Sequence, residues 1–140
     1  MRAIVIMFVL LCAIGGSLAA EERYDVIVHP DNPITEVDRS FVRDAYLKKV
    51  QRWGKGESIR PIDLPPKISL RDRFTQDVIR KTPSQLKNYW NQQIFSGKGV
   101  PPPEADSARE VIGYVLSHPG AIGYIPAGTD PHGAKVLKVR

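Results

Sequence analysis

The run PGAIGYI, from Pro119 to Ile125, decides the fold of this 140-residue chain. Small and β-branched residues in such a run are typical of a strand that lies inside a sheet with other backbone packed closely against it. Gly123 leaves room for a neighbouring element, and the hydroxyl of Tyr124 needs water or a hydrogen-bond partner. We therefore expect a buried strand over Ala121 to Ile125 in the middle of the fold, covered by the other elements.

The first half of the chain reads as a strand, a helix and a short strand. Aromatic and β-branched residues predict a strand over Tyr24 to Val28, which the proline-rich loop His29 to Pro33 ends. Apolar residues at helical spacing predict a helix from Arg39 to Lys48. The stretch from Ser58 to Leu64 alternates apolar and polar residues around Pro61, which predicts a short strand near an edge of the sheet.

Three more helices and a last strand follow. Ser69 opens the first helix, and Asp72 stands three residues later, a spacing close to that of a capping box. Thr82 and Pro83 end that helix and begin another, and a further helix covers Ser107 to Ser117. The final strand is predicted over residues 135–139. The predicted inward faces of the last two helices are Leu86, Tyr89, Trp90, Gln93 and Ile94, and Ala108, Val111, Ile112, Val115 and Leu116. The order of elements is that of a small α/β layer structure, with Trp53 and Trp90 in its core.

The chain begins with the features of an export signal. Arg2 supplies a positive charge, residues 3–14 are apolar, and small residues follow as far as Ala20. This pattern predicts a cleavable signal peptide over residues 1–20, a single domain over residues 21–140 and a periplasmic location. The alternative is an uncleaved membrane anchor. It fits less well because the apolar run falls short of the ~20 residues that a spanning helix needs, so we expect no stable membrane insertion after cleavage.

The predicted mature chain is basic and free of cysteine. Loss of Arg2 reduces Lys and Arg from 20 to 19 against 15 Asp and Glu, a net charge of +4. For an exported protein we expect anionic solutes or an anionic envelope surface as partners, and no nucleic acid. Ordinary solubilising charge explains the balance equally well. Cys12 falls within the predicted signal, so we expect neither a disulfide nor a thiolate metal site.

No catalytic or metal-binding pattern stands out in the sequence. His29, His118 and His132 lack close ligand spacing, and neither a G-x-S-x-G run nor a remaining cysteine offers a nucleophile. Asp63 and Asp72 could be imagined as a carboxylate pair, but their spacing does not support one. We therefore expect a protein without enzymatic activity, metal or cofactor.

Several runs together resemble the phosphate-type periplasmic substrate-binding proteins of ABC transporters. These runs are VIVHPDNP from Val26, AYLKK from Ala45 followed by Trp53, SLRDRF from Ser69 and HPGAIGYI from His118. The resemblance covers residues 25–127. It implies an α/β fold that is a single lobe of the type II periplasmic-binding fold, with a small mixed sheet flanked by helices. It also implies a non-enzymatic solute-binding protein. In this family the ligand is held between two lobes.

The resemblance implies an oxyanion site at the start of a helix. The family's serine-glycine-threonine-arginine run matches Ile68-Ser69-Leu70-Arg71, in which the serine and arginine are present but the glycine and threonine are not recognisable. A helix N-terminus offers unpaired backbone N–H groups, Ser69 a hydroxyl, and Arg71 a planar fork that matches phosphate or carboxylate. The implied ligand-binding residues are Ser69, Leu70 and Arg71, with the loop of Asn32 alongside. Helix capping by Ser69 and Asp72, and turn formation by Asn32, are the alternatives.

Two functions of different classes remain open at this point. The first is an exported protein that binds phosphate or a similar oxyanion, with a homodimer or a second-lobe partner protein needed to enclose the ligand. The second is an envelope protein-interaction or accessory module that keeps the fold and has lost ligand binding. Ser69 and Arg71 favour the first, whereas Leu70 and the acidic Asp72 in the first turn favour the second. An enzyme would require two of the histidines to converge within metal-binding distance.

Overall fold

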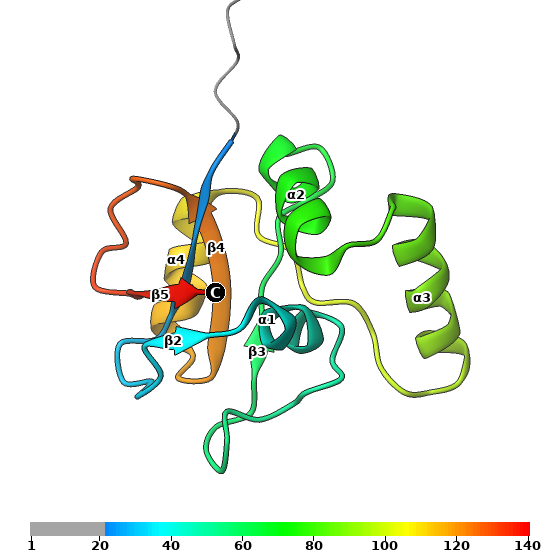
Figure 1. Cartoon of the computed structure of the whole chain (residues 1–140), viewed down its shortest axis with the longest axis horizontal. Helices are drawn as coiled ribbons and strands as arrows, with labels where there is room; N and C mark the ends of the chain where they lie inside the picture. Colours follow the sequence, from blue (N-terminus) through cyan, green and yellow to red (C-terminus); the bar gives the residue numbers. More distant parts are fainter. Residues whose placement is uncertain (1–21) are drawn as a thin grey trace, which may run out of the picture.

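The computed structural model describes residues 22–140, so the predicted signal peptide over residues 1–20 lies outside the described residues. Within that range, five strands form one mixed sheet in the order β2-β5-β1-β4-β3 (Figure 1). Their bounds are β1 Tyr24–Val28, β2 Glu36–Val37, β3 Arg60–Pro61, β4 Ala121–Pro126 and β5 Lys135–Val139. β1 is antiparallel to both β4 and β5, whereas β2 and β3 run parallel to β5 and β4. No helix of residues 22–140 is long and apolar enough to cross a membrane.

The strand expected in the middle of the fold, β4, lies one place from the centre. β1 is central because it pairs on both sides: Val26 lies opposite Tyr124 of β4 and opposite Leu137 of β5. β4 is still enclosed, since Pro61 of β3 pairs with Ile122 on its other side. The edge position predicted around Pro61 is confirmed. Only Arg60–Pro61 of the predicted strand is regular, and a proline without an N–H group suits this edge position.

Helices cover both faces of the sheet. The helices of the described residues are α1 (Arg39–Tyr46), α2 (Ser69–Phe74) with its π-helical continuation η1 (Thr75–Ile79), α3 (Pro83–Phe95) and α4 (Ala108–Ser117). Neighbouring positions of a strand point to opposite faces. On β4, Gly123 faces Val111 and Val115 of α4, and the ring of Tyr124 stacks on Phe74 of α2. α4 therefore lies on one face and α2 on the other, whereas α3 stands away from the sheet (Figure 1).

β4 carries a glycine where α4 comes closest. A Cβ atom built on Gly123 would lie 2.6 Å from Cγ1 of Val111 and 2.9 Å from Cγ2 of Ile62, closer than side-chain carbons approach one another. The prediction that Gly123 makes room for a neighbouring element is confirmed. The elements that fill this room are α4 and the residue that follows β3.

Aromatic side chains fill the face of the sheet opposite α4. Tyr46, Phe74 and Tyr124 are all buried, and the hydroxyl of Tyr46 donates to the carbonyl of Ile62 at 2.8 Å. Both tryptophans belong to the core as predicted, since Trp53 is 7% exposed and Trp90 is 8% exposed. A buried hydroxyl needs an acceptor, so the carbonyl of Ile62 fixes the orientation of the Tyr46 ring.

Two predicted inward positions are wrong. Ile94 is 52% exposed and Leu116 is 36% exposed. Leu116 follows the buried Val115 directly, and one residue along a helix turns the side chain by about 100°, away from the sheet. Ile94 lies near the end of α3, which stands apart from the sheet, so the apolar stripe of this helix has little to cover it (Figure 1).

The helix caps also differ from the prediction. The N-cap of α2 is Ile68, and no side chain caps this helix, so the expected capping box of Ser69 and Asp72 is wrong. A capping box instead begins α3. Oγ1 of Thr82 accepts from the backbone N of Gln85 at 3.2 Å, and Oε1 of Gln85 accepts from the backbone N of Thr82 at 3.0 Å. Ser69 is already inside its helix, where its hydroxyl cannot reach the N–H groups of the first turn.

Candidate functional site

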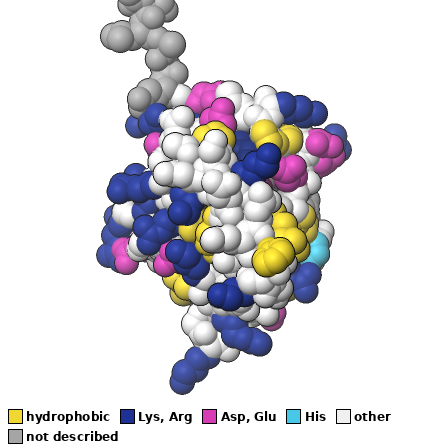
Figure 2. All heavy atoms as spheres, turned by 90° about the vertical axis from the view of Figure 1, so that its right-hand side faces the viewer, with side chains coloured by type: hydrophobic (Ala, Val, Ile, Leu, Met, Phe, Trp, Pro, Cys, Tyr) yellow, Lys and Arg dark blue, Asp and Glu magenta, His cyan; other side chains and the backbone are white. Residues whose placement is uncertain are grey.

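A cleft between α2, α3 and the connector of residues 101–104 combines charged groups with an apolar wall. Its volume is about 670 Å³. Figure 2 looks onto the side of the molecule that carries α3, where hydrophobic side chains lie among basic and acidic ones. We call this cleft between α2, α3 and the connector the Arg71 cleft. Its lining includes the charged residues Asp63, Arg71, Asp72, Lys87 and Glu104, and the apolar residues Pro66, Leu86, Trp90, Ile94 and the three prolines 101–103.

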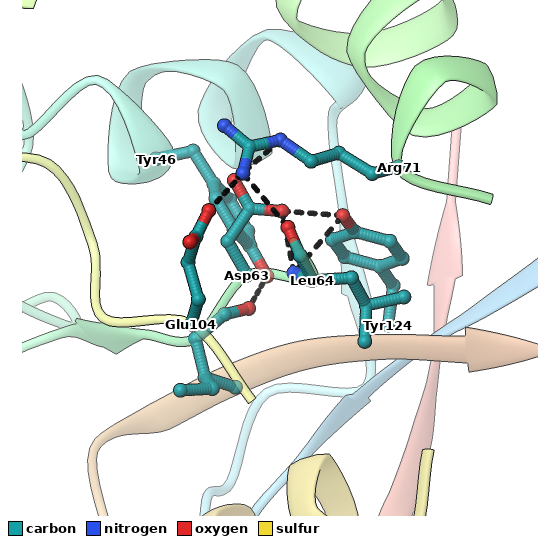
Figure 3. Close-up of polar contacts among 7 residues, drawn as sticks. Tyr46, Asp63, Leu64, Arg71, Glu104 and Tyr124 are labelled. Carbon is teal, nitrogen blue, oxygen red and sulfur yellow. Dashed lines mark hydrogen bonds and ion pairs between the residues drawn. The ribbon is translucent and has the colours of Figure 1, made fainter. Parts of the chain in front are cut away.

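Arg71 reaches from α2 to two carboxylates and a carbonyl (Figure 3). Its Nη1 donates to the carbonyl of Leu64 at 2.8 Å and to the carboxylate of Glu104, and its Nε lies 3.8 Å from Oδ2 of Asp63. Within residues 22–140, no hydrogen bond engages Nη2 (Figure 3). The protein's own carboxylates therefore occupy the guanidinium of Arg71 on one side.

Backbone pairing brings the two carboxylates to the same guanidinium. The backbone N of Asp63 donates to the carbonyl of Pro103 at 2.9 Å, and the backbone N of Ala105 donates to the carbonyl of Asp63 at 2.8 Å. These bonds form a parallel bridge between Asp63 and Glu104. The connector is thus attached to the segment that follows β3, and it carries Glu104 into reach of Arg71.

The inner carboxylate, Asp63, belongs to a buried hydrogen-bond network. One oxygen, Oδ1, accepts from the hydroxyl of Tyr124 and from the backbone N of Leu64, the latter at 2.8 Å. Burial raises the pKa of Asp63, and the positive charge of Arg71 opposes that rise. Burial and the neighbouring Asp63 carboxylate also raise the pKa of Tyr124, so this phenol stays a hydrogen-bond donor.

The other residues predicted at the helix start lie outside the Arg71 cleft. The hydroxyl of Ser69 donates to Oε1 of Glu22 at 2.7 Å, and Leu70 is only 5% exposed. Both line a separate hollow of about 200 Å³ together with Arg23. The hydroxyl of Ser69 and the guanidinium of Arg71 therefore lie in different surroundings, and each of these groups already binds a carboxylate of the chain. A ligand role for Ser69 and Leu70 stays a prediction.

Asn32 lies at the other end of β1 from Ser69. The partner of Ser69 is Glu22, which precedes the strand, whereas Asn32 follows it. Oδ1 of Asn32 accepts from the backbone N of Ile34 at 2.9 Å, which is the geometry of an Asx turn. The Nδ2 of Asn32 is buried with no hydrogen-bond partner among the described residues, and its backbone carbonyl accepts from Nζ of Lys135. Among residues 22–140, no hydrogen bond or ion pair joins Asn32 to Ser69 or Arg71, and a ligand role for Asn32 stays a prediction.

Each of the three histidines contacts a residue close to it in the sequence. His29 and His132 lie 3.8 Å and 3.9 Å from Asp31 and Asp130, and His118 contacts the carbonyl of Tyr114. Across residues 22–140, no group of three or more His, Cys, Asp or Glu side chains could hold a metal ion. The structure therefore offers no arrangement of these residues on which to build metal chemistry.

Sequence reasoning missed two members of the cleft, Asp63 and Glu104. Asp63 was considered only as a partner for Asp72, whereas the structure pairs it across Arg71 with Glu104. Asp63 lies just after β3 and shortly before two prolines, and an ionisable side chain at the end of a strand is a signal for a site. Glu104 follows three prolines and gives no comparable signal, because its partner lies 33 residues away in the sequence.

Comparison with solved structures finds the same fold in phosphate-transport proteins. A Vibrio cholerae ABC-type phosphate transport receptor matches with a TM-score of 0.68 and 16% identity, over 84% of this chain and 46% of the receptor. PstS from Borrelia burgdorferi matches with a TM-score of 0.67 and 18% identity, over 85% of this chain and 47% of that protein. A Clostridium perfringens protein assigned to phosphate ABC transporters and solved with bound phosphate has a TM-score of 0.66 and 21% identity, over 84% and 45% of the two chains.

The chain has the fold of a single lobe of a periplasmic binding protein. It spans less than half the length of each of these solved structures. No family model and no curated protein matches the sequence. The α/β fold class with a small mixed sheet flanked by helices, which the sequence predicted, is confirmed.

Proposed function

We propose that this protein is a periplasmic, non-enzymatic binding protein that holds the anionic group of a small solute on Arg71. One observation carries the proposal: the carboxylate of Glu104 binds Nη1 of Arg71 at the edge of the cleft, and it is an oxyanion supplied by the chain itself. A guanidinium matches carboxylate and phosphate oxygens through the same fork of N–H groups. The phosphate named for the similar solved structures supports a small anion as ligand.

Glu104 is the group that an incoming anion would displace. The side chain of Glu104 is 44% exposed, whereas that of Asp63 is 13% exposed. The backbone on both sides of Glu104 is held by the bonds to Asp63, so its side chain can rotate into water without moving the connector. The solute has to compete with this internal carboxylate in an open cleft, so we expect weaker binding than in a two-lobed clamp that encloses its ligand.

Titration with inorganic phosphate, followed by calorimetry, tests the proposal. Glu104→Gln removes the competing charge and should strengthen binding by roughly tenfold, since hydrogen bonds to charged groups are worth about 1.5–3 kcal/mol. Arg71→Met should abolish binding. Lys138→Gln, a change on β5 of a side chain that is 76% exposed, is the control and should leave binding unchanged.

Two results would contradict the Arg71 cleft as the site. Binding that is equal in wild type, Arg71→Met and Glu104→Gln would remove Arg71 from the ligand. Binding that is lost in Ser69→Ala but unchanged in Glu104→Gln would move the site to the start of α2, where the sequence resemblance implies it.

A second function, protein interaction, is favoured by the end of α3. Phe95 is 96% exposed, and Ile94 and Val100 are 52% and 57% exposed. Figure 2 shows hydrophobic side chains exposed on this side of the molecule. Exposed apolar groups of this size are typical of a contact surface, here with a second copy of the chain or a second-lobe partner. Sedimentation of wild type and Phe95→Asp checks this, since association that depends on Phe95 would disappear in the variant.

A further inference from the structure

We infer that the solute of the Arg71 cleft is a zwitterion of the amino-acid type with an apolar side chain, rather than inorganic phosphate. The inference rests on the proposed function, in which Arg71 holds an anionic group. It adds the identity of the rest of the ligand, argued from the charges, the free groups and the walls of the cleft.

The charges of the cleft do not suit a multiply charged anion. Three carboxylates line it, those of Asp63, Asp72 and Glu104, against the two cations of Arg71 and Lys87. Phosphate would add one to two negative charges to a half-enclosed site that already has an excess of acidic groups, where like charges repel more strongly than in water. A zwitterion adds no net charge, and it can pair with both kinds of group at once.

The cleft offers an acceptor for an ammonium group as well as a donor for a carboxylate. Among the described residues, no hydrogen bond or ion pair engages the carboxylate of Asp72, which lies on α2 one residue after Arg71. The carboxylate of Glu104 is bound by Arg71 and is 44% exposed. An ammonium group has three donors and can bind both acids, while the ligand carboxylate takes the guanidinium of Arg71, whose Nη2 has no hydrogen-bond partner in residues 22–140. Glu104 then exchanges its bond to Arg71 for one to the ammonium group.

The walls of the cleft suit an apolar body. Leu86, Trp90 and Ile94 of α3 line the cleft of about 670 Å³ together with Pro66 and the prolines of the connector. This volume is within the roughly 300–1,000 Å³ that small-molecule sites occupy, and it exceeds what an inorganic anion needs. Ile94 is 52% exposed, and an aromatic or aliphatic side chain in the cleft would cover it. Burial of such a side chain raises affinity by about 10- to 100-fold.

Calorimetric titrations of the protein with six compounds at pH 7 and matched ionic strength test the inference. The compounds are L-phenylalanine, glycine, 3-phenylpropionate, phenethylamine, acetate and inorganic phosphate. L-Phenylalanine should bind at least tenfold more tightly than each of the other five, because it alone offers the carboxylate, the ammonium group and the apolar side chain together.

Four variants connect the affinity to the residues named. Asp72→Asn changes an exposed side chain that has no hydrogen bond or ion pair with residues 22–140, so the protein should fold. It should weaken the binding of L-phenylalanine several-fold without affecting that of 3-phenylpropionate. Ile94→Ser should weaken L-phenylalanine but not glycine. Val136→Ser, on β5 and 45% exposed, is the matched control and should change neither. Arg71→Met should abolish binding of every carboxylate.

The outcomes separate this inference from the proposed function. Phosphate that binds more tightly than L-phenylalanine, and depends on Arg71, overturns the inference and leaves the proposed function in place. Equal binding of L-phenylalanine and 3-phenylpropionate also overturns the inference, because the ammonium group then has no partner. Absence of binding by all six compounds, or binding that Arg71→Met leaves unchanged, overturns both.

Discussion

The ring of Phe74 lies flat on the ring of Tyr124, with the ring centroids 3.9 Å apart and the planes inclined by 6°. The stack joins α2 to β4, and the hydroxyl of the same tyrosine donates to Asp63. Asp63 in turn forms an ion pair with Arg71, three residues before Phe74 on α2. One aromatic contact thus fixes the helix that carries the guanidinium and also orients the carboxylate that faces it.

Replacement of Phe74 by alanine should therefore cost a large part of the stability. Phe74 is 1% exposed, and removal of a buried phenylalanine ring costs about 3–5 kcal/mol. Phe95→Ala is the matched control, because that ring is 96% exposed and its loss should change the free energy of unfolding by less than about 0.5 kcal/mol. Urea denaturation of both variants measures the difference. A cost below about 1 kcal/mol for Phe74→Ala would contradict the central place of the stack.

Alanine at Gly123 should destabilise the protein through overpacking. The added Cβ would lie 2.6 Å from Val111 and 2.9 Å from Ile62, and both neighbours are held by surrounding core, so we expect a cost of about 1–3 kcal/mol. Gly113→Ala tests the same change on α4, where the added Cβ would meet nothing within 4 Å apart from its chain neighbours and the backbone of its own helix. There it should stabilise by about 0.5–1 kcal/mol, because glycine is unfavourable inside a helix. Thermal and urea denaturation should show that Gly123→Ala lowers the free energy of unfolding and that Gly113→Ala raises it. Equal changes in the two variants would contradict the close approach of α4.

The helix caps make a third prediction. Thr82→Ala removes the side chain that accepts from Gln85 and should destabilise by about 0.5–2 kcal/mol. Ser69→Ala removes only an exposed hydrogen bond to Glu22, so its effect on the free energy of unfolding should stay within about 0.5 kcal/mol. Denaturation of the two variants side by side checks this. A larger loss for Ser69→Ala would restore the cap that the sequence pattern predicted for α2.

Stability should depend on pH through Asp63. Burial raises the pKa of this carboxyl above its ordinary value of 3.8, so the folded protein binds the proton more tightly than the unfolded chain does. The contribution of Asp63 to stability is therefore fully present below pH 3.8 and is lost as the pH rises through the raised pKa. Asp63→Asn lacks this titration, so the free energy of unfolding of wild type minus that of the variant should fall over this window.

Urea denaturation at a series of pH values between about 3 and 7 measures this difference. The charged and titratable groups around Asp63 include Arg71, Glu104, Tyr124 and Tyr46. Glu104 is the second carboxylate that contacts Arg71, so both proteins are compared again in the Glu104→Gln background. A difference that rises with pH would mean that the attraction of Arg71 outweighs burial and that the pKa of Asp63 is lowered.

Local sequence signals predicted most of the regular elements. The residues of β1, β4 and β5 were identified from their β-branched and aromatic runs, and the start of α3 from Thr82-Pro83. The predictions failed where neighbouring residues or elements decide the position of a cap or the burial of a side chain. Ser69 looks like a cap in the sequence, but the extended Ile68 before it holds that position. Ile94 fits an apolar stripe, but α3 stands apart from the sheet and leaves it exposed.

The candidate site depends still more on long-range contacts. Arg71 could be singled out from the sequence because an arginine near the start of a helix suits an anion. Its partners Asp63 and Glu104 could not, since a parallel bridge between two irregular segments joins them. The sequence by itself determined most of the strands and helices, though not the two-residue β2, because backbone preferences and side-chain periodicity act over a few residues. Only the tertiary structure decided which charges meet in the Arg71 cleft, because that depends on how α2, α3 and the connector pack around the sheet.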